Sequence, residues 1–232
     1  MNPGDDRLIL FVVTSHGQLG ETGKETGYYL PEVSHPHRIL INKGYSIDFV
    51  SPLGGRPPMD PGSAESMDDV SRQFLETDTW SEALHNSLRP DQIDPKRYRA
   101  VFYAGGHGTM WDFPDNQYLA SIAATIYRNG GVVAAVCHGP AGLVNVRIDD
   151  DFLVQGKTVT CFTNQEEPAV ALADIVPFLL EDRLRQRGAV IIPAAPFQAQ
   201  VVTSQRLVTG QNPASAEGVG LAIAKLLEAE PD

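Results

Sequence analysis

The chain has 232 residues, of which 42% are apolar and 20% are charged, as in an ordinary globular protein. A chain of this length can fold as one domain with a large core, so a second domain is not required. Its formal net charge of −11, without any long cluster of lysine and arginine, argues against a nucleic-acid partner.

Two further features bear on the compartment in which the protein works. No apolar run is long enough for a transmembrane helix, and residues 1–6 are acidic, unlike the basic and then apolar start of a signal peptide. Two cysteines give no disulfide framework, which is typical of a reducing compartment. We therefore predict a cytoplasmic protein without a membrane partner.

Strand-like and helix-like segments alternate along the chain. Residues 7–14 form a nearly continuous apolar run, typical of a parallel strand covered on both faces. Further strands are predicted at residues 46–51, 100–104, 132–136, 157–162, 189–192, 200–203 and 207–210. Helices are predicted at residues 26–43, where Pro31 and Pro36 indicate a kink or break, at 116–129, at 169–187, and in a terminal segment that Asn212 caps. This alternation predicts a mostly parallel sheet between layers of helices, with ligands at the carboxyl ends of the strands.

Residues 53–97 do not follow the alternation. They are rich in Pro, Asp and Ser, with short helical turns predicted at 66–77 and 80–88. We interpret this segment as an insertion that lies over the sheet as a lid, within a single domain spanning residues 1–232.

The segment from Val132 to Leu143 has the pattern of a nucleophile elbow. An apolar strand leads into Cys137, and Gly139-Pro140 then starts a helix. In an elbow the reactive side chain stands on a tight, strained turn at the top of the sheet. The N-terminus of the following helix should favour the thiolate, so we predict that Cys137 is a nucleophile. Cys161, predicted in the middle of a strand, is interpreted as structural.

A glycine cluster, Gly105-Gly106-His107-Gly108, directly follows the preceding strand. Glycines at a strand end let the backbone approach a ligand and present N–H groups to it. Adjacent parallel strands would bring this loop beside the elbow. We therefore predict an oxyanion hole formed by the backbone of Gly106 and His138, with Gly105 as a further contributor.

All six histidines lie at or before position 138. The histidine that serves Cys137 must therefore be His138 or one from the first half of the chain. Because adjacent side chains on a turn diverge, we expect His138 to reach sideways to a carboxylate rather than toward the sulfur. Glu166 and Glu167 are both candidates for that carboxylate.

Glu32 lies in an apolar stretch after the first strand. A buried, unpaired carboxyl has a raised pKa and can donate a proton or a hydrogen bond to a thiolate. The alternative is a solvated helix residue. His35 and His37, two residues apart, do not share a helix face, and without a further ligand cluster we predict no metal site.

Four motifs together resemble the ThiJ/PfpI superfamily: Cys137-His138-Gly139-Pro140, Gly105-Gly106-His107-Gly108, Glu32 within ETGYYLPEVSHP, and Asn212-Pro213-Ala214-Ser215. The chain is most similar to the branch of heat-shock-type chaperones and glutathione-independent glyoxalases, from about Leu8 to Leu227. The resemblance implies a flavodoxin-like sandwich, a homodimer and no cofactor.

The resemblance also assigns roles by position. Cys137 would be the nucleophile, His138 the base and Glu32 an acid/base that contacts the cysteine. The acidic third member of the triad falls on Glu167, with Glu166 as the alternative because the Glu-Glu pair permits a slip of one residue.

The leading hypothesis is a glyoxalase III (D-lactate dehydratase) that converts methylglyoxal, a small 2-oxoaldehyde, to D-lactate through a hemithioacetal on Cys137. Each step needs only a thiolate, a base and an oxyanion hole. The alternatives are a holding chaperone for unfolded client proteins, a protein deglycase, a redox-responsive stress protein with Cys137 as its sensor and, less favoured, a cysteine peptidase.

Overall fold

The computed structural model describes residues 7–65 and 67–229. The acidic segment 1–6 lies outside the described residues, as do residue 66, where one predicted helical turn begins, and residues 230–232.

A six-stranded sheet forms the centre of the fold, in the order β2-β1-β3-β4-β10-β9. Its strands are β1 (Leu8–Val12), β2 (Ser46–Val50), β3 (Ala100–Tyr103), β4 (Val132–Val136), β9 (Val201–Ser204) and β10 (Leu207–Gly210). All neighbours are parallel except β9 and β10, which are antiparallel. The predicted α/β architecture with a mostly parallel sheet is confirmed.

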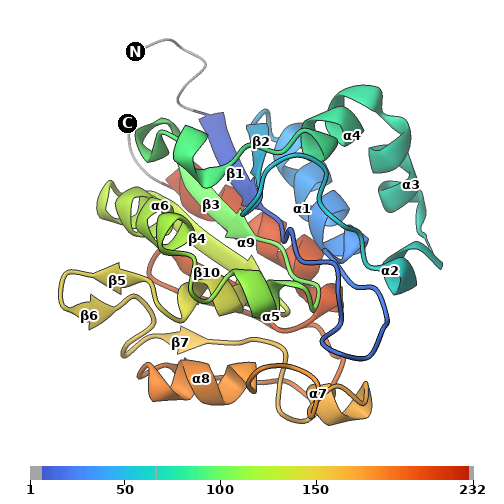
Figure 1. The fold of residues 1–232 in the computed structure, drawn as a ribbon. Coiled ribbons are helices and arrows are strands. Elements are labelled where there is room, and N and C mark those ends of the chain that lie inside the picture. The colour runs from blue at the N-terminus through green and yellow to red at the C-terminus, as the bar shows by residue number, and fades with distance from the viewer. Residues whose placement is uncertain (1–6, 66, 230–232) are drawn as a thin grey trace.

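Helices cover both faces of this sheet (Figure 1). Helices α1 (Leu30–Asn42) and α9 (Ala216–Ala229) pack on one face, and α6 (Gln117–Arg128) packs on the other. Strand β4 is apolar at every position because both of its faces are buried. Val133 and Ala135 join the core under α6, while Val132, Ala134 and Val136 join the core under α1 and α9. None of the described helices is long and apolar enough to cross a membrane.

The remaining elements are short. They are α2 (Pro61–Glu65), α3 (Asp69–Glu76), α4 (Asp78–His85), α5 (Thr109–Asp112), α7 (Glu166–Ala169), α8 (Leu180–Gln186), β5 (Arg147–Ile148), β6 (Asp151–Phe152), β7 (Thr158–Val159), β8 (Val190–Ile191) and the 3₁₀ helices η2 (Pro90–Gln92), η3 (Pro95–Arg97), η4 (Gly139–Leu143) and η5 (Pro213–Ser215).

The structure corrects three predicted elements. The helix predicted at 169–187 is only α8, because Pro177 cannot donate a backbone hydrogen bond and disfavours helix in the residue before it. The strands predicted at 157–162 and 189–192 shrink to β7 and β8, which pair with each other outside the main sheet. Cys161 therefore follows a strand instead of lying within one, although it is fully buried.

Helix α1 runs unbroken through both prolines. Pro31 stands in the first turn, where a missing N–H costs nothing, and Pro36 lies inside the helix. Gly220 of α9 lies against Pro36, since a Cβ added to Gly220 would come within 2.9 Å of the Pro36 Cα. The predicted break is thus wrong, whereas a kink at Pro36 stays a prediction, and α1 is in close contact with α9.

The insertion packs mainly at the edge of the sheet. Helices α3 and α4 contact α1 and β2, and the imidazole of His37 on α1 meets Phe74 and Trp80 edge-on, with ring centroids 4.9 Å away in each case. Before them, the backbone of Pro58 accepts a hydrogen bond from Tyr28. The lid function stays a prediction.

The close contact between the elbow and β3 gives a first prediction. A Cβ at Gly139 would lie 2.2 Å from the carbonyl oxygen of Tyr103, so backbone would have to shift. Gly139→Ala should lower the free energy of unfolding by about 2 kcal/mol or more in urea titrations. Gly156→Ala is the control, because that position has a φ of +71° but no atom within 4 Å of an added Cβ, and should cost only about 1 kcal/mol. Equal losses would contradict the steric argument.

Candidate active site

Cys137 lies on the turn that ends β4, with a φ of 59°. A residue with a Cβ adopts this left-handed conformation only where its surroundings hold it. Here the N–H of Cys137 donates to Gly210 at 2.9 Å, and its carbonyl accepts from the N–H of Phe162 at 2.9 Å. Helix η4 starts directly after His138. This is the backbone geometry of a nucleophile elbow.

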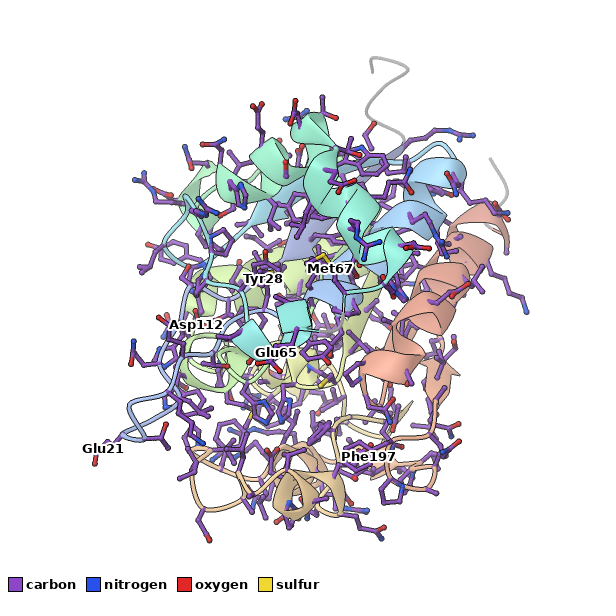
Figure 2. All side chains as sticks on the ribbon, turned by 90° about the vertical axis from the view of Figure 1, so that its right-hand side faces the viewer. Glu21, Tyr28, Glu65, Met67, Asp112 and Phe197 are labelled. Carbon is purple, nitrogen blue, oxygen red and sulfur yellow. The ribbon has the colours of Figure 1, made fainter. Side chains whose placement is uncertain are left out.

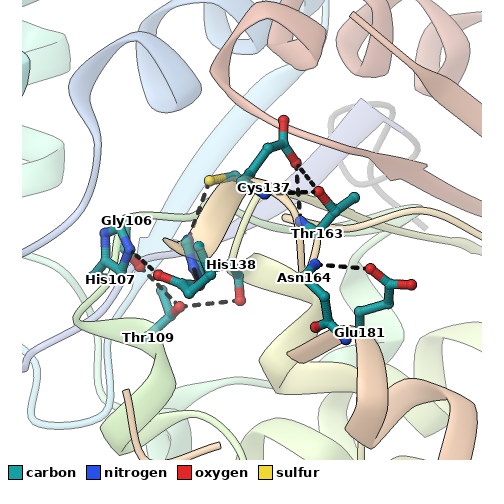
Figure 3. A network of polar contacts seen from close by, with 10 residues as sticks. Gly106, His107, Thr109, Cys137, His138, Thr163, Asn164 and Glu181 are labelled. Atoms are coloured by element: carbon teal, nitrogen blue, oxygen red, sulfur yellow. Dashed lines mark hydrogen bonds and ion pairs between the residues drawn. The ribbon is translucent and has the colours of Figure 1, made fainter. Parts of the chain in front are cut away.

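The His138 side chain touches both the sulfur and a carboxylate. Its Nδ1 lies 3.3 Å from the Sγ of Cys137, and its Nε2 lies 2.7 Å from Oε2 of Glu167. Figure 3 shows Cys137 and His138 joined in this way. The expectation that His138 would turn away from the sulfur is therefore wrong, because the strained turn leaves the two side chains within contact distance.

Glu167, and not Glu166, faces His138. The Glu166 carboxylate is buried and accepts bonds from the N–H and hydroxyl of Thr163 at 2.9 and 2.8 Å, from the N–H of Phe197 at 2.8 Å, and from the amide of Asn212 at 2.9 Å. It thus fixes the loops around the site. Of the two candidates that the sequence left open, only Glu167 is placed to orient the imidazole.

The sequence reasoning missed His107 as a functional candidate. Its Nε2 lies 2.9 Å from Oε1 of Glu167, and its ring centroid lies 4.0 Å from that of His138. Glu167 therefore holds two imidazoles, one on each oxygen. The available signal was the histidine inside the glycine cluster after β3, since β3 and β4 are neighbours in the sheet.

Glu32 is fully buried in α1 and reaches the other side of the elbow. Its Oε2 accepts the N–H of Gly105 at 2.8 Å. Its Oε1 has no hydrogen bond in the described part of the chain, although the Cys137 thiol lies near enough to stabilise the ionised form. The solvated alternative is excluded by this burial.

The predicted oxyanion hole loses one member. Because the Gly105 N–H is bound to Glu32, it is not available to a substrate oxygen. Gly105 instead provides space, since a Cβ there would lie 2.4 Å from Oε2 of Glu32 and 3.0 Å from the Cβ of Cys137. The N–H of Gly106 has no acceptor within residues 7–65 and 67–229, and that of His138 points to the sulfur. These two remain the candidate donors.

Burial sets most of the electrostatics of the site. It raises the pKa of Glu32 to about 8, against the opposing effects of the Cys137 thiol and the Gly105 N–H. It also raises the pKa of Cys137, with the Glu32 and Glu167 carboxylates adding to the effect and the His138 N–H opposing it. Burial therefore opposes the predicted thiolate, which stays a prediction.

On the opposite side of the elbow, the pKa values of His138 and Glu167 are lowered. Burial, followed by the neighbouring His107, lowers the pKa of His138 to about 4. Burial would raise the pKa of Glu167, but the two imidazoles outweigh it and lower that pKa to about 2. Near neutral pH, His138 is thus neutral and Glu167 ionised. Since a carboxylate only accepts hydrogen bonds, Nε2 of His138 carries the proton and Nδ1 offers a lone pair to the thiol.

Among the described residues, His107, His138 and Glu167 form a group that could hold a metal ion, with ligand atoms within 4.8 Å of one another. Both Nε2 atoms are directed at the same carboxylate, at distances of ordinary hydrogen bonds. The rings also lie closer than two imidazoles on one tetrahedral ion would allow without moving. The arrangement is that of a carboxylate that orients two imidazoles, and the absence of a metal stays a prediction.

The fold and the site define a class of protein: an α/β sandwich that carries a cysteine on a nucleophile elbow, with an adjacent histidine and buried carboxylates beside it. Within that class, residues 25–226 match the DJ-1/PfpI family, and the chain belongs to this family. The resemblance to ThiJ/PfpI proteins is thereby confirmed.

Individual relatives are similar over nearly their whole length. The chain is 34% identical over 225 residues to Glyoxalase 3 of Candida albicans, covering 90% of this chain and 93% of the relative. The crystal structure of glyoxalase III from Candida albicans has a TM-score of 0.91 at 31% identity, covering 97% of this chain and 99% of the other. The structure of the Rapid Encystment Protein 24 kDa from Francisella tularensis has a TM-score of 0.93 at 40% identity, covering 95% and 99%.

The buried Glu32 predicts a pH dependence of stability. Its pKa is about 8 in the folded state against 4.5 as the ordinary value, so the unfolded chain releases a proton that the folded chain retains. Wild-type stability should therefore fall as pH rises between these values. Glu32→Gln mimics the protonated carboxyl and should gain stability over the wild type across that range, on the order of a few kcal/mol in urea unfolding. Glu217→Gln, exposed on α9, is the control, and equal pH profiles for Glu32→Gln and wild type would contradict the assignment.

Proposed function

We propose that this protein is a glutathione-independent glyoxalase that converts methylglyoxal to lactate, with Cys137 as its nucleophile. The observation that carries the proposal is the contact of 3.3 Å between Sγ of Cys137 and Nδ1 of a neutral His138 that Glu167 orients. It is supported by the similarity to Glyoxalase 3 and glyoxalase III of Candida albicans. The D enantiomer of the product follows from the resemblance to the glyoxalase branch alone.

The first step is addition of the thiol to the aldehyde. As the bond between Sγ and the aldehyde carbon forms, the thiol proton passes to Nδ1 of His138, and the carbonyl electrons move onto the oxygen. The N–H groups of Gly106 and His138 would receive that oxygen. His138 then returns the proton to it, which gives a neutral hemithioacetal. Removal of the proton during attack avoids a free buried thiolate.

The second step is an isomerisation through an enediol. A base removes the proton from the former aldehyde carbon and returns it to the neighbouring carbon, while a hydroxyl proton moves between the two oxygens. Glu32 and His138 flank the sulfur and are the candidates for these transfers. The product is a lactate thioester of Cys137, with no net gain or loss of electrons. Water then cleaves the carbon–sulfur bond, releases lactate and restores the thiol.

Of the alternative functions, the structure bears on the cysteine peptidase. Cys137 is only 4% exposed, which disfavours a peptidase because a polypeptide needs an open cleft. The holding-chaperone, deglycase and redox-sensor roles, the homodimer and the cytoplasmic location stay predictions from sequence.

The two cysteines provide a matched pair of variants. Cys137→Ala should abolish formation of lactate from methylglyoxal without glutathione, with little change in thermal stability. Cys161→Ala should keep turnover and lose some stability, because it leaves a small cavity in a packed core. Substantial lactate formation by Cys137→Ala would refute the nucleophile, and loss of turnover in a folded Cys161→Ala would refute the distinction.

The adjacent glutamates should separate orientation from support. Glu167→Gln cannot accept hydrogen bonds from both imidazoles and should lower kcat by about 10- to 100-fold, as loss of an orienting carboxylate does. Glu166→Gln replaces one acceptor of a loop anchor, so it should lower the melting temperature more than kcat. The reverse order of these effects would show that Glu166 acts on His138.

A further inference from the structure

We propose that His107 is a positioning residue for the reaction, acting through Glu167 on His138. The inference rests on the proposed function, because it assigns His107 a part in preparing the base that serves Cys137. His107 contacts both Glu167 and His138, although a triad of Cys137, His138 and Glu167 gives it no role.

The geometry requires a second donor on Glu167. The side chain of Glu167 is 3% exposed and that of His138 is 0% exposed, so neither carboxylate oxygen has ready access to water. Oε2 is occupied by His138 and Oε1 by His107. Without His107, Oε1 would be a buried acceptor without a partner, and the carboxylate could rotate or take up a proton. Either change would release His138 from the tautomer that leaves Nδ1 free.

His107 also acts on His138 directly. Their ring centroids are 4.0 Å apart, and the proximity of His107 lowers the pKa of His138, second only to burial. The other groups that face this pair are Glu167 from α7, the Cys137 thiol, and the ring of Phe162, whose centroid is 4.5 Å from that of His138 and 5.9 Å from that of His107. The charge of Glu166 acts on His138 from farther away. Removing the imidazole of His107 should therefore let His138 take up a proton at higher pH.

Two substitutions separate the hydrogen bond from the ring. His107→Gln keeps an N–H that can reach Oε1 but removes the ionisable ring, whereas His107→Leu removes both. We expect kcat to stay within about threefold of wild type for His107→Gln and to fall by about 10- to 100-fold for His107→Leu, with little change in KM. The acid limb of kcat/KM should move to higher pH in both variants.

Several outcomes would overturn the proposal. The first is a His107→Leu variant with the kcat of the wild type and an unshifted acid limb of kcat/KM. The second is an equal loss of kcat in folded His107→Gln and His107→Leu. The third is a His107→Leu variant whose melting temperature falls while its kcat is unchanged. Alkylation of Cys137 by iodoacetamide across the pH range tests His107 without methylglyoxal. His107→Leu should shift that profile, and an unshifted profile counts against the proposal. If Cys137→Ala still forms lactate, the proposed function fails, while the alkylation result still decides the role of His107.

A separate observation concerns a cationic cleft away from Cys137. An open cleft of about 790 Å³ lies between α6, the β5–β6 hairpin and Arg187, which directly follows α8. Three arginines line it, Arg128, Arg147 and Arg187, against one acidic residue, Asp115, in a chain whose net charge is −11. Figure 1 shows α6 and the hairpin side by side at one edge of the molecule.

Two of these guanidinium groups are held in place by neutral acceptors. Arg187 donates to the carbonyl of Val144 at 2.9 Å and to the amide oxygen of Asn145 at 2.8 Å. Arg147 donates to the carbonyl of Asp150 at 2.7 Å. Within residues 7–65 and 67–229, neither has a carboxylate within ion-pair distance, whereas Arg128 faces Asp149 at 3.6 Å.

The guanidinium groups of Arg147 and Arg187 both lie against the ring of Phe152. The guanidinium carbons of Arg147 and Arg187 lie 4.1 and 4.4 Å from the ring centroid of Phe152. Two like charges fixed on one ring repel each other unless an anion is shared, and the planar fork of each guanidinium matches phosphate and carboxylate. Asn116, Gln117 and Ser121 add polar groups suited to hydroxyls.

From this arrangement we infer that the cleft binds a small phosphorylated, hydroxyl-bearing molecule. Titration calorimetry with ribose 5-phosphate, inorganic phosphate and ribose tests it. Saturable binding of ribose 5-phosphate is expected, weaker for phosphate and lost for ribose. Arg147→Gln should weaken it at least about tenfold, and Arg72→Gln, an exposed arginine on α3, should leave it unchanged.

The result that overturns this inference is no saturable binding at millimolar concentrations, or equal weakening by Arg147→Gln and Arg72→Gln. A change of oligomeric state in Arg147→Gln, measured by sedimentation, would assign the cleft to a contact between copies of the chain and would also overturn it.

Discussion

The left-handed backbone of Cys137 is the constraint on which the rest of the site depends. It turns the sulfur out of the top of β4, and hydrogen bonds to Gly210 and Phe162 hold it from both sides. Glycines keep the neighbouring backbone clear: a Cβ at Gly139 would strike the carbonyl of Tyr103, and one at Gly105 would strike the Glu32 carboxylate. The sheet and the loop that follows β7 thus fix the nucleophile by backbone contacts.

Around this fixed sulfur, burial gives two carboxyl groups opposite properties. Within the described residues Glu32 has one N–H donor and no cationic partner, so desolvation raises its pKa to about 8. Glu167 is almost as buried, but two imidazoles lower its pKa to about 2. Carboxyl groups whose pKa values are driven apart in this way suit an acid on one side and an orienting anion on the other. The neutral His138 between Glu167 and the sulfur completes a site that can move protons without a metal ligand.

The sequence was sufficient wherever function depends on a local pattern. The apolar run into Cys137 and the following Gly-Pro predicted the elbow, whereas the setting of Glu32 left burial and solvation both open. It was insufficient where contacts join distant segments. The Gly105 N–H is used by Glu32, and His107 meets Glu167 across 60 residues of chain, which no periodicity reveals. The helix predicted at 169–187 is too long because Pro177 interrupts it. The pairing of β7 with β8 covers only two residues of each strand, so Cys161 lies outside the strand.

Burial also decides which chemistry such a cysteine can support. A thiol with a raised pKa is a poor nucleophile when it must ionise first, but not when its proton leaves during attack. Nδ1 of His138 already lies 3.3 Å from the sulfur, so the transfer needs no rearrangement of the chain. Cys137 as a whole is only 4% exposed, which disfavours an extended peptide as its substrate. Phe197, labelled in Figure 2, has an exposed side chain, and its backbone N–H donates to the Glu166 carboxylate beside the site. Thus the burial that opposes a free thiolate at Cys137 also limits access to it.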